Sequence, residues 1–127
     1  MGRVLIVDDD ADSRETLGMV VESWGHEVAQ AVDGPTALSA MEWFTPEIVI
    51  VDLGLPGMDG VKVVEFIRTM DGYRAFVIAL TGWTRPQDRE EALRAGCSLF
   101  LSKPADLDQL ARTLESASAR AERRRGS

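Results

Sequence analysis

Two apolar runs in this chain each end in acidic residues. Residues 4–7 (VLIV) lead directly into three aspartates, residues 8–10, and residues 48–51 (IVIV) lead into Asp52. A carboxylate beside apolar surface is costly unless a cation or a proton accompanies it. Acidic groups that converge at strand ends are therefore typical of a divalent metal site, with a phosphoryl group as a further candidate ligand. By itself the pattern indicates a metal site of unknown purpose.

A structural role competes with this interpretation for each acid. An aspartate directly before a helix often caps the helix by accepting a hydrogen bond from a backbone N–H group of its first turn. We expect that role for Asp10, which precedes an amphipathic segment. Asp52 is followed by LGLPG and not by a helical pattern, so a capping role does not suit it.

The elements that must position these acids alternate regularly along the chain. Short apolar runs predict strands at residues 3–7, 26–31, 48–51, 76–80 and 99–101. Amphipathic segments between and after them predict five helices, which end near Gly25, Pro46, Met70, Gly96 and Ala117. The apolar positions expected in the third helix are Val63, Phe66, Ile67 and Met70.

This alternation predicts an α/β fold. Continuous apolar strands separated by helices indicate a parallel sheet covered on both faces. We expect a flavodoxin-like, doubly wound three-layer sandwich with five strands in the order 2-1-3-4-5 and five helices. In that order the first and third strands are neighbours at the switch point, where ligands bind beyond the carboxyl ends of the strands. Thr81 and Lys103, which end the fourth and fifth strands, would reach the same edge.

Length and composition limit the possible functions. The 127 residues, 45% of them hydrophobic, are sufficient for one domain with a single core. A net charge of −7 argues against direct binding of nucleic acid. The lone cysteine, the lack of a secretory signal and the lack of a membrane-spanning stretch predict a cytoplasmic protein that does not bind a membrane.

Four motifs give the chain a resemblance to a known family. Residues 7–10 (VDDD), 52–60 (DLGLPGMDG), 80–82 (LTG) and 102–104 (SKP) resemble the receiver domain of two-component response regulators, including receivers associated with hybrid sensor kinases. The resemblance implies a receiver domain over residues 1–119. Residues 120–127, which are rich in arginine, would then form a frayed C-terminal tail.

The resemblance implies a phosphorelay function. Asp52 would be the nucleophile that accepts a phosphoryl group from a histidine kinase or a histidine phosphotransfer protein. The required Mg²⁺, for which Mn²⁺ could substitute, would be held by Asp9, Asp52 and the backbone carbonyl of Gly54, with Asp8 acting through a water molecule. The domain would be a regulatory phosphoacceptor and not an enzyme.

The same resemblance assigns roles to the other strand ends. Lys103 would contact a phosphoryl oxygen, and the peptide bond between Lys103 and Pro104 would be cis. Thr81 would hydrogen-bond the phosphoryl group and form a switch pair with Phe100, although Phe100 could equally be a core residue. Trp83 and Gly54 would flank the phosphoryl group and modulate its lifetime.

Alternatives to phosphorelay signalling stay open. A pseudo-receiver that binds partners without phosphorylation would share this fold. An aspartyl-phosphate phosphatase is less favoured, because it needs a second acid where Gly54 stands. The resemblance places the partner-binding surface on the fourth helix, fifth strand and fifth helix, with Arg89, Arg94 and Arg112 as candidate contacts.

Overall fold

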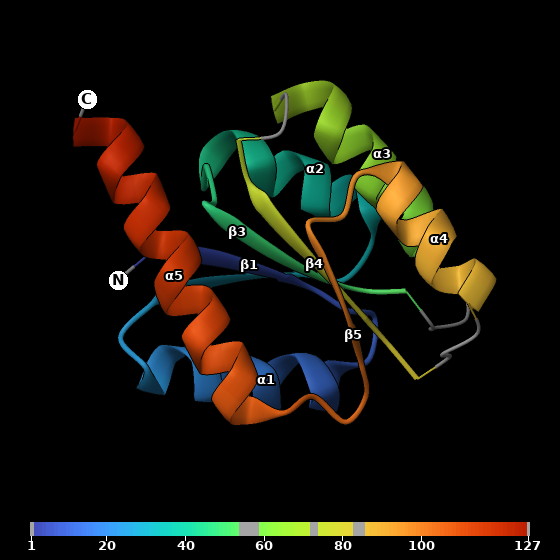
Figure 1. Cartoon of the computed structure of the whole chain (residues 1–127), viewed down its shortest axis with the longest axis horizontal. Helices are drawn as coiled ribbons and strands as arrows, with labels where there is room; N and C mark the ends of the chain where they lie inside the picture. The colour runs from blue at the N-terminus through green and yellow to red at the C-terminus, as the bar shows by residue number, and fades with distance from the viewer. Residues whose placement is uncertain (1, 54–58, 72–73, 83–85, 127) are drawn as a thin grey trace.

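The structure, a computed structural model, describes residues 2–53, 59–71, 74–82 and 86–126. Within these residues, five strands and five helices alternate along the chain (Figure 1). The strands are β1 (Arg3–Val7), β2 (Glu27–Ala31), β3 (Ile48–Asp52), β4 (Phe76–Thr81) and β5 (Leu99–Ser102). The helices are α1 (Ala11–Ser23), α2 (Gly34–Trp43), α3 (Gly60–Asp71), α4 (Pro86–Ala95) and α5 (Leu107–Gly126). None of the described helices has the length and apolar character needed to cross a membrane.

The sheet is parallel and its strand order is β2-β1-β3-β4-β5, which confirms the predicted flavodoxin-like topology. Val7 pairs with Val51 across β1 and β3. Asp52 pairs with Leu80, one residue before the end of β4, and Thr81 pairs with Ser102 at the end of β5. The register therefore brings the carboxyl ends of β1, β3, β4 and β5 to one edge of the sheet.

Helices cover both faces of the sheet and divide the core in two. Strand residues alternate between the faces, so that Leu5 and Val49 join the core under α2, α3 and α4, whereas Ile6 and Ile50 join the core under α1 and α5. Figure 1 shows α2, α3 and α4 on one side of the sheet and α1 and α5 on the other. Burial on both faces explains why the strands are continuous apolar runs.

Local capping groups define the ends of several helices. Asp10 precedes α1, and its side chain accepts hydrogen bonds from the Ser13 N–H at 3.4 Å and from the Ser13 hydroxyl at 2.7 Å. Its expected role as a helix cap is thereby confirmed. Gly25, just beyond α1, has a φ of +94°, a left-handed conformation that glycine adopts at no steric cost.

The buried face of α3 differs from the one expected. Of the four apolar positions expected in α3, Val63 and Ile67 are buried, whereas Phe66 is 54% exposed and Met70 is 43% exposed. The buried face of α3 is formed by Val63, Val64 and Ile67, together with a buried arginine, Arg68.

Helix α5 continues into the segment for which a frayed tail was expected. It extends to Gly126, and Ala117 and Ala121 both face the core. Leu114, Ala117 and Ala121 follow one another at helical spacing, so the apolar stripe that anchors α5 continues beyond residue 119. Helical order beyond that residue follows from this longer stripe.

Candidate functional site

The Asp52 carboxylate lies at the carboxyl end of the central strand β3 and is only 3% exposed. Its Oδ2 atom contacts the Nζ atom of Lys103, whose side chain is 33% exposed. A buried carboxylate needs such a partner, because desolvation without compensation is costly. The structure therefore joins two of the residues expected at this edge, from strands β3 and β5.

Asp8 is the second buried acid at this edge. It is 5% exposed and follows β1 directly. Burial raises its pKa above the ordinary value, a hydrogen bond from the Asp10 N–H at 2.8 Å lowers it, and the nearby negative charge of Asp52 raises it. The positive charge of Lys103 acts in the opposite direction to that of Asp52. These mutual effects place Asp8, Asp52 and Lys103 within one electrostatic cluster.

Asp9 and Asp10 differ from Asp8 in being exposed. Because Asp10 accepts hydrogen bonds from Ser13, its pKa is lowered from the ordinary value. Asp9 lies between the buried carboxylate of Asp8 and the start of α1, where its side chain reaches solvent. The three consecutive aspartates thus have three environments, of which only that of Asp10 is explained by capping.

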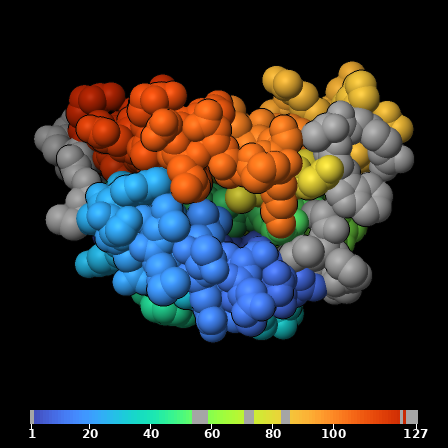
Figure 2. All heavy atoms as spheres, turned by 90° about the horizontal axis from the view of Figure 1, so that it is seen from below, coloured from blue at the N-terminus to red at the C-terminus, as the bar shows by residue number. Residues whose placement is uncertain are grey.

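Thr81 and Lys103 are adjacent at the ends of β4 and β5. Thr81 is 2% exposed, and its carbonyl oxygen accepts a hydrogen bond from the Lys103 N–H at 2.8 Å. The peptide bond between Lys103 and Pro104 is cis. Phe100, two positions before Ser102, is half-buried and packs against the core under α2, α3 and α4. In Figure 2, blue N-terminal atoms and orange atoms of the segment that follows β5 flank a recess in which green atoms from the middle of the chain are visible.

Two expected site residues, Gly54 and Trp83, lie outside the described residues. The remaining expected ligands, Asp8, Asp9 and Asp52, lie within the described residues. Among the residues described, no three His, Cys, Asp or Glu side chains form a ready-made metal cluster. The donors present still fit Mg²⁺, because Asp8 and Asp52 are carboxylates that interact electrostatically, and Mg²⁺ keeps several waters and needs few protein ligands.

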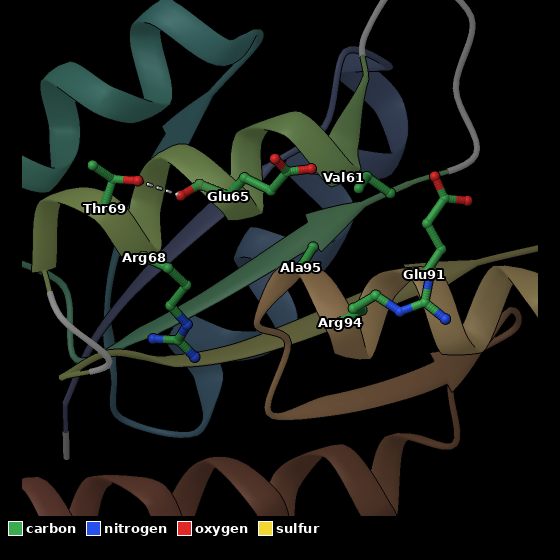
Figure 3. Close-up of a pocket in the computed structure, with 7 residues that line it drawn as sticks. All are labelled: Val61, Glu65, Arg68, Thr69, Glu91, Arg94 and Ala95. Carbon is green, nitrogen blue, oxygen red and sulfur yellow. Dashed lines mark hydrogen bonds between the residues drawn. The ribbon is translucent and has the colours of Figure 1, made fainter.

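The sequence did not predict the burial of Arg68, which lies beside a groove separate from the site at the strand ends. A groove of about 550 Å³ between α3 and α4 is lined by Glu65, Arg68 and Arg94, among other residues (Figure 3). Arg68 is 8% exposed and donates hydrogen bonds to the carbonyls of Gly96 and Ala75, both at 2.7 Å, and to the Ser98 hydroxyl at 3.1 Å. The sequence did hold a signal for this burial, because Arg68 follows Ile67 directly and lies four residues after Val64, within the apolar stripe of α3.

The three arginines proposed as partner contacts lie on two different helices. Arg89 and Arg94 are exposed on α4, and Arg94 forms an ion pair with Glu90 at 3.8 Å. Arg112 is exposed on α5, where it lines a groove of about 300 Å³ together with Arg120. All three are accessible, as a partner surface requires.

Known proteins resemble this chain in sequence. The family model "response regulator receiver domain" matches residues 4–115. The transcriptional regulatory protein PrrA of Mycobacterium tuberculosis is 39% identical over 108 residues, which are 85% of this chain and 46% of PrrA. A 14.6 kDa protein from the sodA1 3′ region of Leptolyngbya boryana is 36% identical over 113 residues, 88% of this chain and 86% of that protein. The chain therefore spans less than half of PrrA but most of the smaller relative.

Solved structures resemble the chain in fold. The chemotaxis protein CheY4 of Vibrio cholerae superposes with a TM-score of 0.84 at 30% identity, over 92% of this chain and 98% of that one. A CheY-like receiver domain protein from Methanospirillum hungatei gives a TM-score of 0.87 at 24% identity, over 98% of each chain, and supports the fold alone. Receiver domains are regulatory phosphoacceptor modules that generally bind Mg²⁺. The chain belongs to the receiver-domain family of two-component response regulators.

Proposed function

We propose that this receiver domain accepts a phosphoryl group on Asp52 from the phosphohistidine of a histidine kinase or a histidine phosphotransfer protein. The observation that carries the proposal is the buried Asp52 carboxylate in contact with Lys103, with the second buried carboxylate of Asp8 in the same electrostatic cluster. A purely structural ion pair would not need the additional buried acid, whose pKa is raised by its burial.

The transfer is a displacement at phosphorus. An Asp52 carboxylate oxygen attacks the phosphorus of the donor phosphohistidine, a new P–O bond forms, and the P–N bond to the imidazole breaks. The imidazole nitrogen that leaves takes up a proton from solvent. The product is an acyl phosphate, a mixed anhydride in which the Asp52 carboxylate has lost its own negative charge and carries a phosphoryl group instead.

Mg²⁺ fits the donor set at this edge, and Asp8, Asp9 and Asp52 are the side chains that would hold it, with the Gly54 carbonyl as a further ligand. When bound, the ion neutralises charge on the transferring oxygens and on the clustered carboxylates. Asp8 is held ready by the 2.8 Å hydrogen bond from Asp10, which fixes one of its carboxylate oxygens. Asp9 is exposed and can reach a ligand from solvent.

Lys103 and Thr81 act on the phosphoryl group. Lys103 forms an ion pair with Asp52 before transfer, and after transfer its ammonium group pairs with a phosphoryl oxygen, since the carboxylate charge has moved there. The Thr81 hydroxyl donates a hydrogen bond to another phosphoryl oxygen. Phe100, which is half-buried beside β4, responds to any movement of Thr81, and this movement alters the surface of α4, β5 and α5 that a protein partner reads.

Phosphorylation of the isolated chain by acetyl phosphate tests the proposal. Intact mass is measured with Mg²⁺ and with EDTA for the wild type, Asp52→Asn and the matched control Asp33→Asn, in which asparagine preserves the cap that Asp33 forms on α2. We expect one added phosphoryl group in the wild type and in Asp33→Asn, only with Mg²⁺, and none in Asp52→Asn. An unmodified wild type would instead favour a pseudo-receiver that acts by binding alone.

A further inference from the structure

Arg14, in the second turn of α1, connects the acidic turn to the edge strand β2. Its NH1 group donates a hydrogen bond to the backbone carbonyl of Asp8 at 3.0 Å. Its Nε–H group donates to the side-chain oxygen of Gln30, on β2, also at 3.0 Å. The guanidinium is rigid and planar, so two bonds in different directions fix its position.

The backbone N–H, the backbone carbonyl and the carboxylate of Asp8 each form a hydrogen bond. The Asp8 N–H donates to the Ala31 carbonyl at 3.1 Å, and the Asp8 carboxylate accepts from the Asp10 N–H at 2.8 Å. Arg14 holds the remaining polar group, the Asp8 carbonyl. Because a peptide bond is planar, fixing this carbonyl also fixes the N–H of Asp9 and the direction in which the Asp9 chain leaves.

A glycine makes room for this arrangement. Gly18 is buried on α1, and a Cβ atom added there would lie 3.1 Å from Nε2 of Gln30. That distance is tighter than ordinary van der Waals contact, so a side chain at this position would press on the amide that holds Arg14. Because Gly18 has no side chain, the Gln30 amide can lie against α1 beside Gly18 and accept the hydrogen bond from Arg14.

We propose that Arg14 is a positioning residue for the metal site and that it acts through the Asp8 carbonyl, with Gln30 as its support. The proposal rests on the proposed function, because it assigns Asp8 and Asp9 to Mg²⁺. Asp9 is exposed, and its approach to an ion is therefore determined by the backbone that Arg14 holds.

The direction in which Mg²⁺ affinity changes when Arg14 is replaced distinguishes a positioning role from an effect of its charge. Arg14 is a cation near a site for a divalent cation, so through-space repulsion alone predicts that its removal tightens Mg²⁺ binding. Positioning predicts the opposite, since a freed Asp8–Asp9 peptide must be ordered when the ion binds. Lysine retains the charge but lacks the planar fork, so Arg14→Lys also distinguishes the two effects.

Calorimetric titration with Mg²⁺ at fixed ionic strength tests the proposal in Arg14→Met, Arg14→Lys and Gln30→Met. Arg120→Met, which removes an exposed arginine from the distant helix α5, is the charge control. We expect the Kd for Mg²⁺ to rise about tenfold in Arg14→Met and nearly as much in Arg14→Lys, by analogy with residues that orient metal ligands. Gln30→Met, which leaves the charge unchanged, raises it about threefold, and Arg120→Met leaves it unaltered.

A metal-free readout accompanies the titration. The Asp10 amide, which donates to Asp8, is expected to exchange its hydrogen faster in EDTA when Arg14 is replaced by methionine, because the turn opens more often. Tighter or unchanged Mg²⁺ binding in both Arg14→Met and Gln30→Met overturns the positioning role and leaves the proposed function intact. A wild-type protein that takes up no Mg²⁺ overturns the metal part of the proposed function, and the role of Arg14 with it.

Discussion

Replacement of Arg68 by methionine is expected to destabilise the protein strongly, although it replaces a charged residue with an apolar one on the buried face of α3. The guanidinium is buried and donates to two carbonyls, of Gly96 and Ala75, and to the Ser98 hydroxyl. Methionine keeps the volume of the aliphatic stem but removes all of these donors. A buried acceptor that loses its donor costs about 1–3 kcal/mol, so two carbonyls give an expected loss of about 3 kcal/mol in the free energy of unfolding.

The matched control is Arg94→Met, on the other side of the same groove. The Arg94 side chain is 79% exposed, and its ion pair with Glu90 spans 3.8 Å on the surface of α4. Such a pair contributes at most about 0.5 kcal/mol, so this change is expected to be nearly neutral. Urea unfolding followed by circular dichroism measures both variants. A difference of less than about 1 kcal/mol between them would refute the assignment of Arg68 as a buried anchor.

A double-mutant cycle with Gly96 tests the same contact from its other side. Gly96 has a φ of +120°, and a Cβ atom added there would lie 2.5 Å from Cγ of Arg68. Gly96→Ala therefore carries both backbone strain and a steric clash. In the Arg68→Met background the more flexible side chain can relieve part of the clash, so the two changes are expected to cost less together than the sum of their separate costs.

Three further outcomes are expected. Burial lowers the pKa of His26 from its ordinary value of 6.5, and the negative charges of Glu115 and Glu47 oppose this shift. As the pH falls, the imidazole is therefore protonated in the unfolded state before it is protonated in the folded state. Stability should therefore fall as the pH decreases below 6.5, and urea midpoints should show a smaller fall in His26→Gln; an equal fall would contradict this. Burial raises the pKa of the Cys97 thiol to about 11, so Ellman's reagent at neutral pH should modify the native protein far more slowly than the urea-unfolded one, and equal rates would contradict it. The buried Ser118 hydroxyl has no hydrogen-bond partner within the described residues, so Ser118→Ala should stabilise the protein by about 1 kcal/mol in urea unfolding; a loss of stability would show that the hydroxyl is satisfied.

Continuous apolar runs made the fold accessible from sequence. A strand buried on both faces needs apolar residues throughout, and the runs at 4–7, 48–51 and 76–80 met that condition. The strand boundaries were less accurate, since Asp52 belongs to β3 and Ser102 belongs to β5, and both pair within the sheet. Polar residues at these ends are accommodated because the sheet edge carries the site.

The face of a helix was harder to predict than its presence. Helical spacing grouped Phe66 with Val63 and Ile67, but the buried face of α3 includes Arg68 instead, which hydrogen bonds hold inward. Two of the acceptors, the Gly96 carbonyl and the Ser98 hydroxyl, come from the segment between α4 and β5, about thirty residues along the chain, so a local pattern cannot show them. The exposed position of Phe66 follows from this long-range anchoring.

The sequence predicted which strand-end residues form the candidate site, but not the residues that support them. Strand order alone brings Asp8, Asp52, Thr81 and Lys103 to one edge, and the structure places them there. Arg14 was missed, because its partner on β2, Gln30, becomes a neighbour only in the folded protein. The roles of Gly54 and Trp83 stay predictions from family resemblance.

The central claim is that Asp52 itself carries the phosphoryl group, and mapping the modified residue tests it most directly. The protein is treated with acetyl phosphate and Mg²⁺, the acyl phosphate is reduced with borohydride, and peptides are sequenced by mass spectrometry. Reduction converts an aspartyl phosphate to homoserine, and we predict this conversion at Asp52 alone. Conversion at Asp8 or Asp9 in place of Asp52, or a phosphoryl group found on a hydroxyl side chain such as Thr81, would contradict the account.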